Sequence, residues 1–416
     1  MTSTYQGGVS AFLIPMSWKR GNNMLFSLAL IFTIGLILGE FFTKVKLPGF
    51  IGMIITGVVL GPFALNMIDS SILDISRDLR EVALIVILIR AGLNLDISDL
   101  KKIGRPALLM SFLPATLEII TIIIVAPLLF DISYIDAAIL GSVLAAVSPA
   151  VVVPKMIKLM DQGYGKEKRI PHLIMASASV DDIYVIVLFS AFISMYQTGD
   201  VSLTSLYVVP ISIVLGALLG GITGFLLSKV FAKFRVRDTI KVLIILAAAF
   251  FIISLEDFVV DYIAISGLLA IMVLGITFLN QSEERAIRLR DKFSKLWVFA
   301  ELVLFVLVGA AVDISVALDA GLLALVLLSA GLLFRFSGVM ISLIKTNLNK
   351  YERLFAGISY LPKATVQAAI GAVPLALGVP SGELILALAV LAIIISAPLG
   401  AIGIDLTYKN FLKKDE

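Results

Sequence analysis

Residues 170–189 read IPHLIMASASVDDIYVIVLF and place two adjacent carboxylates, Asp181 and Asp182, inside an apolar run of membrane-spanning length. The pair lies about eleven residues into this run, roughly 16 Å along a helix and near the bilayer midplane. Because adjacent residues on a helix point about 100° apart, one carboxylate can face an aqueous cavity while the other faces a neighbouring helix. Carboxylates are costly at this depth, so we predict an ion- and proton-binding site here, with a pair of structural anchors as the alternative.

The amino-acid composition indicates the same class of protein. Of the 416 residues, 60% are hydrophobic and 15% are charged, whereas a soluble domain has about 25% charged residues. The apolar runs of about 20 residues predict an all-α polytopic membrane protein and exclude a soluble enzyme. The chain has no cysteine and one histidine, His172, which excludes disulfides and metal sites rich in Cys or His. It also has no phosphate-binding lysine motif, and its basic residues are dispersed, so we expect no cofactor, nucleotide or nucleic acid.

Thirteen apolar runs are candidate transmembrane helices, with boundaries good to a few residues. They cover residues 24–42, 49–66, 80–95, 106–130, 136–158, 171–196, 206–230, 239–255, 261–279, 295–314, 319–344, 354–377 and 384–406. Most of the 33 basic residues fall in alternate loops, as in the clusters at 155–169 and 285–295. Because cytoplasmic loops carry this excess, we predict a multi-pass protein of the plasma (inner) membrane with its N-terminus outside and its C-terminus in the cytoplasm.

Two of these runs contain prolines away from their ends. One reads AAVSPAVVVP over residues 145–154, and the other reads LPKATVQAAIGAVP over residues 361–374. Since a mid-span proline removes a backbone hydrogen bond, we predict two broken helices that line a cavity, although a simple kink is possible for either. The two runs are seven spans apart and cross in opposite directions, which is typical of inverted-topology repeats, here spans 4–6 and 11–13. The residues expected to support the site at these breaks are Ser148, Pro149, Pro154, Thr365 and Gln367.

Other charged residues inside the runs need partners, because an unpaired charge at this depth is costly. We expect Glu118 to pair with Lys363 and Arg335 to pair with Asp181, although the partners can also be exchanged. Arg90 is close to the cytoplasmic end of its run, where it either joins these core ion pairs or extends to the interface.

These segments together resemble the sodium/proton antiporters of the cation–proton antiporter superfamily, most closely the solute carrier 9 subgroup B branch. The resemblance rests on RAGLNLD at 90–96, AVSPAVVVP at 146–154, GYG at 163–165, the Asp181–Asp182 pair and YLPKATVQAAIG at 360–371. It covers nearly the whole chain from about residue 24.

The resemblance implies a homodimer with two domains that move relative to each other like an elevator. Residues 24–95 and 206–314 would form the dimerisation domain (spans 1–3 and 7–10), and residues 106–196 and 319–406 the ion-transporting core (spans 4–6 and 11–13). Residues 1–23 would be an N-terminal leader and residues 407–416 a cytoplasmic tail. By motif match, Asp182 would bind either Na⁺ or a proton, and Asp181 would modulate the site or pair with span 11. Ser148 and Thr365 would offer oxygen ligands or stabilise the breaks.

Two positions depart from the family pattern. Many relatives with two aspartates have a lysine where this chain has Arg335, and arginine hardly ever deprotonates, so a lysine-based proton release cannot be assumed. Some relatives have an acid at the position of Ala311, so a salt bridge there is absent.

The sequence therefore predicts a secondary antiporter that exchanges Na⁺ or Li⁺ for H⁺ by competition at Asp182 and serves pH homeostasis. Potassium/proton exchange and a sodium-coupled organic solute symporter of similar fold are the alternatives. An intramembrane aspartyl protease needs its two acids on different helices, where they can share a proton, so consecutive aspartates argue against an enzyme.

Overall fold

The computed structural model describes residues 23–94, 104–198, 205–234, 236–259, 263 and 265–414, without the side chains of residues 198 and 205–210. Every regular element in this part of the chain is a helix, apart from an isolated bridge between Tyr164 and Lys414. The predicted leader, except Asn23, lies outside the described residues. Asn23 caps the first helix by accepting a hydrogen bond from the backbone N–H of Phe26.

The helices follow one another without intervening domains. In chain order they are α1 (Met24–Lys44), α2 (Gly49–Leu60), α3 (Ser70–Asp74), α4 (Ser76–Asn94), α6 (Arg105–Phe130), α7 (Tyr134–Ala145), α8 (Pro149–Asp161), α9 (Ile170–Thr198), α10 (Ser205–Lys233), α11 (Asp238–Val259), α12 (Gly267–Gln281), α13 (Glu283–Ala310), α14 (Ile314–Ser342), α15 (Lys350–Ser359), α16 (Thr365–Ile370), α17 (Val373–Ala376) and α18 (Gly382–Phe411).

Within the described ranges, nine helical segments are long and apolar enough to cross a membrane. Three shorter apolar segments, at Gly49–Leu60, Gly267–Gln281 and Thr365–Ala376, accompany them. The all-helical membrane architecture is therefore confirmed, while the count of thirteen spans and the repeat relationship stay predictions. Two predicted runs were too long: α2 ends at Leu60, where the chain turns at Gly61, and α12 begins only at Gly267.

Two helices are interrupted at the positions that the prolines predicted. The first interruption, at residues 146–148, separates α7 from α8, and Pro149 is the first residue of α8, where its missing N–H costs nothing. The second, at residues 360–364, separates α15 from α16 and contains Pro362. Pro154, however, lies inside α8 and not at a break. A proline within a helix removes one hydrogen bond but keeps a helical φ, so it need not end the helix.

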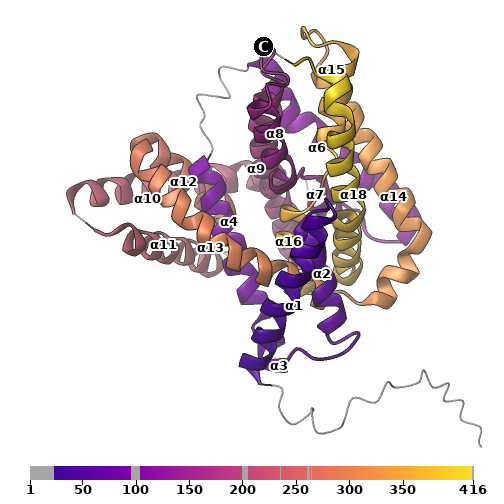
Figure 1. Cartoon of the computed structure of the whole chain (residues 1–416). Coiled ribbons are helices and arrows are strands. Elements are labelled where there is room, and N and C mark those ends of the chain that lie inside the picture. Colours follow the sequence, from indigo (N-terminus) through magenta and orange to yellow (C-terminus); the bar gives the residue numbers. More distant parts are fainter. Residues whose placement is uncertain are drawn as a thin grey trace, which may run out of the picture.

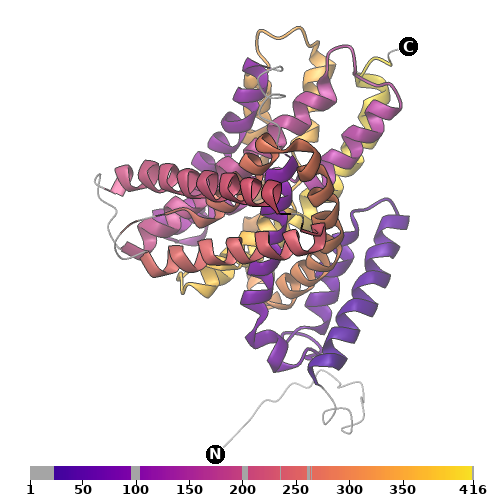
Figure 2. The same cartoon turned by 90° about the vertical axis from the view of Figure 1, so that its left-hand side faces the viewer.

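The helices pack into two groups that lie side by side (Figures 1 and 2). In the first, which we call the scaffold group (α1–α4 and α10–α13), α10 packs on α12, and α13 packs on α2 and α4. In the second, the core group (α6–α9 and α14–α18), α6 packs on α14, α7 and α9. Small residues bring backbones together, because a Cβ at Gly57 of α2 would lie only 1.9 Å from the carbonyl oxygen of Val306 on α13.

Candidate functional site

The candidate site lies where the two helix interruptions meet. The backbone N–H of Ser148, in the first interruption, donates a 2.8 Å hydrogen bond to the carbonyl of Pro362, in the second. Interrupting a helix in a membrane frees backbone groups that have no water to bind, so the protein must supply other partners. Side chains of the core group supply them.

Three side chains satisfy the carbonyls at the C-terminal end of α7. Lys363, Arg335 and Gln367 donate hydrogen bonds to the carbonyls of Leu144, Ala145 and Ala146, respectively. A helix end of this polarity carries a partial negative charge, which the two cations offset. Within the gap, the backbone N–H of Val147 donates to Oδ2 of Asp181 at 2.9 Å. The buried charges therefore stabilise the broken helix.

Four buried charged side chains form a single ion-pair cluster. Glu118 of α6 accepts from Nζ of Lys363 at 2.7 Å and from Nη1 of Arg335 at 3.2 Å. Nη2 of Arg335 also lies 2.8 Å from Oδ2 of Asp181. Each of the four residues is at most 1% exposed. The two predicted contacts, Glu118 with Lys363 and Arg335 with Asp181, are both present, and the Arg335–Glu118 contact that joins them was not predicted.

The formal charges of this cluster cancel. Glu118 and Asp181 contribute two negative charges, and Arg335 and Lys363 contribute two positive charges. Buried ion pairs persist only where each charge has a partner and further hydrogen bonds, and the helix carbonyls provide those bonds here. Any additional buried charge in this region is therefore left without compensation.

The two adjacent aspartates have different surroundings. Asp181 is fully buried, and its Oδ2 accepts from both Arg335 and the Val147 backbone. Asp182 is 8% exposed, and its buried Oδ1 has no hydrogen-bond partner among the described residues. The 100° offset along α9 thus directs one carboxylate to the ion-pair cluster and leaves the other unpaired.

Other oxygens near the first interruption also lack partners within the described part of the chain. They are Oδ1 of Asp181, Oγ of Ser148 and Oε1 of Gln367. Buried polar atoms are normally hydrogen-bonded, so these unpartnered oxygens are available to bind a ligand. Oxygen donors of this kind suit a small hard cation. Thr365, the first residue of α16, is also buried beside this region at 1% exposure.

Arg90 does not join the cluster. It lies on α4, which packs on α12 and α13, and it interacts electrostatically with Glu301 of α13. The sequence showed Glu301 within an apolar run, which was a usable signal, but we did not predict its role. Two further contributors had no sequence signal: the Tyr360 carbonyl accepts from Nε of Arg335 at 2.8 Å, and Oγ of Ser396 accepts from the Lys363 backbone at 3.1 Å.

A multi-helix membrane bundle with two interrupted helices, a charge-balanced cluster and, among the described residues, an unpaired carboxylate at Asp182 is typical of an ion-coupled transporter. The family model described as "Sodium/hydrogen exchanger, transmembrane" matches residues 27–409, so the chain belongs to this family. It is therefore a multi-pass membrane protein of the cation/proton antiporter class, and the relatives that it matches are transporters.

Named relatives support this assignment. The chain is 31% identical to human "Sodium/hydrogen exchanger 9B2", over 94% of this chain and 76% of the relative. It is also 31% identical to mouse "Sodium/hydrogen exchanger 9B1", over 97% of this chain and 74% of the relative. The predicted resemblance to the solute carrier 9 subgroup B branch is thus confirmed. A solved structure with a similar fold is that of the sodium proton antiporter MjNhaP1 from Methanocaldococcus jannaschii at pH 8. The two structures match with a TM-score of 0.81 and 18% sequence identity, over 93% of this chain and 98% of that chain.

Proposed function

We propose that this protein exchanges Na⁺ or Li⁺ for H⁺ by competition of the cation and the proton at Asp182. The observation that carries the proposal is the contrast between the adjacent aspartates. Asp181 is held by Arg335 at 2.8 Å, whereas Asp182 is buried with an unpartnered oxygen in the described structure. An unpaired carboxylate in a low-dielectric site requires either a proton or a cation.

The neighbouring oxygens supply further ligands for the cation. A Na⁺ ion at Asp182 would exchange its water ligands for protein oxygens, and Ser148 and Gln367 each offer a buried oxygen without a partner in the described residues. Thr365 lies at the start of α16, where its hydroxyl would support the same site. The ion is a transported substrate here and not a resident cofactor.

The charge balance of the cluster supports obligatory exchange. With Glu118, Asp181, Arg335 and Lys363 summing to zero, one proton or one monovalent cation on Asp182 makes the site neutral. The empty, ionised site carries one uncompensated charge, whose movement through the membrane is costly. We infer that only loaded sites cross, and that one proton exchanges for one cation.

The packing supports movement of the core group against the scaffold group. Within the described residues, ion pairs of the core group stay within it, as for Lys155 of α8 with Asp405 of α18, and Lys168 of the loop before α9 with Glu352 of α15. Those of the scaffold group stay within it, as for Arg288 of α13 with Asp238 of α11. A boundary that no such ion pair crosses can shift without breaking one. We therefore propose an elevator-like motion of residues 106–196 and 319–406 against residues 24–95 and 206–314. We also propose that the protein is a homodimer of the plasma (inner) membrane with its C-terminus in the cytoplasm, and that it serves pH homeostasis.

Transport across proteoliposomes tests the proposal. With an imposed pH gradient read by a pH-sensitive dye, adding Na⁺ or Li⁺ should collapse the gradient for the wild type but not for Asp182→Asn. Asp161→Asn is the matched control, because Asp161 is an exposed carboxylate at the end of α8. A larger response to K⁺ than to Na⁺ would replace the sodium assignment with potassium/proton exchange. If none of the three cations acts across pH 6–9, the antiporter proposal is wrong, and a sodium-coupled organic solute symporter becomes the function to test.

A further inference from the structure

The chain crosses between the scaffold group and the core group three times, after α4, after α9 and after α13. Residues 95–103 of the first crossing and residues 199–204 of the second lie outside the described structure. The first crossing reaches the core group at Gly104, directly before α6, and the third reaches it at Gly321, within α14. A movement of one group against the other has to be absorbed at these connections.

Both glycines adopt a backbone conformation that residues with a side chain rarely allow. Gly104 has φ +72° and ψ −146°, and Gly321 has φ +38° and ψ −122°. The two positions share a positive φ with a strongly negative ψ, a combination that a Cβ disfavours by steric clash with the backbone. A Cβ added at either glycine would meet nothing within 4 Å, so close packing does not require these glycines. The backbone conformation itself requires them.

The bend at Gly321 divides α14 into a short arm, residues 314–320, and a main helix, residues 322–342 (Figure 1). Hydrogen bonds tie the arm to the end of α13. The backbone N–H of Val312 donates to the carbonyl of Gly309 at 3.2 Å, and Asp313 caps the arm by accepting from the backbone N–H of Ser315 at 2.8 Å. Within α14, Gly321 alone departs from helical dihedral angles, so a change of direction is concentrated at this residue.

Beyond the two glycines, α6 and α14 form a closely packed antiparallel pair. Nη1 of Arg105, at the start of α6, donates to the carbonyl of Ile344, just past the end of α14, at 3.0 Å. A Cβ added at Gly338 of α14 would lie 2.6 Å from the Cα of Pro114 on α6, so the two backbones touch. An ion pair of the charged cluster also joins the two helices. The pair can therefore move as one body that carries part of the candidate site.

The two glycines lie at opposite ends of this pair. Each precedes the main part of its helix, and the two helices run in opposite directions. Residues 322–342 extend about 30 Å, which is the thickness of the hydrocarbon core, so one glycine lies near each face of the membrane. The two helices are also the first helices of the two repeats that the sequence predicts. The scaffold therefore holds the pair through a glycine at each end.

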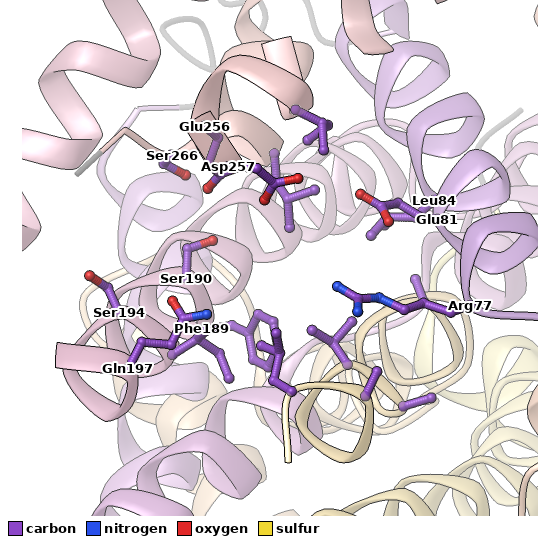
Figure 3. Close-up of a pocket in the computed structure, with 18 of the residues that line it drawn as sticks. Arg77, Glu81, Leu84, Phe189, Ser190, Ser194, Gln197, Glu256, Asp257 and Ser266 are labelled. Atoms are coloured by element: carbon purple, nitrogen blue, oxygen red, sulfur yellow. The ribbon is translucent and has the colours of Figure 1, made fainter. Parts of the chain in front are cut away.

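The boundary between the two groups also leaves room for movement. A cavity of about 230 Å³ separates α4, α11 and the start of α12 from α9, α16 and α17 (Figure 3). In Figure 3 the side chains of Arg77 and Glu81 of α4 lie on one side of this space, and those of Phe189 and Gln197 of α9 lie on the other. Because the described side chains leave this space unfilled, the core helices can shift here without displacing a packed interface.

We propose that Gly104 and Gly321 are the hinges at which the α6–α14 pair, and the core group with it, moves against the scaffold. The inference rests on the proposed function, because it names the residues that absorb the elevator-like motion. Hinges are a few loop or element-terminal residues that take up large changes of φ and ψ. Glycine moves between positive and negative φ at little cost, whereas a residue with a Cβ favours one end of such a motion. With one hinge near each face, the pair moves without breaking the hydrogen bonds within either helix.

Alanine substitution tests the hinges in proteoliposomes. Gly104→Ala and Gly321→Ala should each lower the maximal rate of cation-dependent exchange about tenfold, because alanine shifts the equilibrium between the two positions of the core. The rise in melting temperature with added Na⁺ should persist in both variants, because the ion site is unchanged.

Two other glycines provide matched controls. Gly378 also has a positive φ, of 74°, and open space around a Cβ, but it lies between α17 and α18, inside the core group. Gly378→Ala therefore introduces local strain without touching a connection between the groups, and it should keep the wild-type rate. Gly221→Ala, within α10 and 3.9 Å from its nearest neighbour, should alter neither rate nor melting temperature. Slowing of Gly378→Ala equal to that of the hinge variants, or wild-type rates in both hinge variants, would overturn the proposal.

A distance measurement tests the hinges without requiring transport. The chain has no cysteine, so Lys166→Cys in the core group and Glu283→Cys in the scaffold group, both at exposed positions, accept one spin label each. Double electron–electron resonance at pH 6–9, with and without Na⁺, should resolve two distances in the wild-type background. Their ratio should change about tenfold in Gly104→Ala and in Gly321→Ala but not in Gly378→Ala. A single distance under all conditions, or an unchanged ratio in both hinge variants, would contradict the hinges.

The hinge proposal and the proposed function fail in distinguishable ways. If the wild type shows no cation-dependent exchange, the proposed function fails, and the distance measurement still tests the hinges. If exchange occurs and disappears in Asp182→Asn, while Gly104→Ala and Gly321→Ala exchange at the wild-type rate, the hinge proposal is wrong and the antiporter stands.

Discussion

The sharpest test of the site compares two substitutions at adjacent residues. Asp181→Asn removes a carboxylate that is fully buried and lies 2.8 Å from Nη2 of Arg335. Breaking a buried ion pair typically costs 3–5 kcal/mol, and because Glu118 remains 3.2 Å from Arg335, we expect about 3 kcal/mol here. Asp182→Asn breaks no ion pair and removes the charge of a carboxylate whose Oδ1 has no partner among the described residues. We therefore expect the free energy of unfolding to rise by about 1 kcal/mol. Adjacent positions should thus differ by about 4 kcal/mol in stability.

Thermal unfolding of the purified protein, followed by circular dichroism at 222 nm in Na⁺-free buffer, measures this difference. Wild type and Asp181→Asn should also be compared in increasing NaCl, since a bound ligand stabilises by about 2.7 kcal/mol at 100 times its Kd. Asp182→Asn should melt at or above the wild-type temperature and should not respond to Na⁺. Equal destabilisation by the two substitutions, or a Na⁺-dependent rise in the melting temperature of Asp182→Asn, would refute the division of roles between the aspartates.

Four further substitutions and one transport measurement probe the same structure. Glu118→Gln and Lys363→Met should each lower the free energy of unfolding by about 3 kcal/mol. The double variant should lose about 2 kcal/mol less than the sum of the two single losses, because it restores the charge balance of the cluster. Additive losses in melting experiments would contradict the cluster. Gln367→Leu leaves the Ala146 carbonyl without its 2.9 Å donor and should cost about 1–3 kcal/mol, seen as a lower melting temperature. Hydrogen bonds from Ser71 lower the pKa of Asp69 below its ordinary value of 3.8, so this cap stabilises α3 above that pH and loses its effect as pH falls through the lowered pKa. Asp69→Ala should accordingly speed hydrogen exchange at the Ser71 amide near pH 7, with the difference disappearing in strong acid. If one proton exchanges for one cation, the transport rate should not change with a membrane potential set with valinomycin, because no net charge crosses. An exchange that moves one net charge would respond, since moving that charge through 100 mV changes its free energy by about 2.3 kcal/mol.

The charged contacts of the site were predictable because lipid makes unpaired charge costly. That constraint alone required partners for Glu118, Arg335 and Lys363, and the opposed broken runs indicated which helices would bring them together. The sequence did not predict that Arg335 bridges Glu118 and Asp181. The bridge depends on where the second interruption places the Tyr360 carbonyl, which fixes the guanidinium through a 2.8 Å bond from Nε.

The positions of the breaks were only partly predictable from proline. Pro149 begins α8 and Pro362 lies in the second interruption, but Pro154 lies within α8. The residue type is the same in each case, and the outcome depends on whether neighbouring groups satisfy the freed carbonyl, which is a tertiary property.

Breaking the helices and binding the ion are linked by the same charges. The interruption at residues 146–148 exposes a partially negative helix end, and Arg335 and Lys363 offset it. Two buried cations in turn require two buried anions, which are Glu118 and Asp181. These four groups therefore neutralise one another and the broken helix, so none of them has a charge left for a transported ion. Asp182, one residue further along α9, remains uncompensated, and under the proposed function this is the reason that only one of the two adjacent aspartates would exchange a proton for a cation.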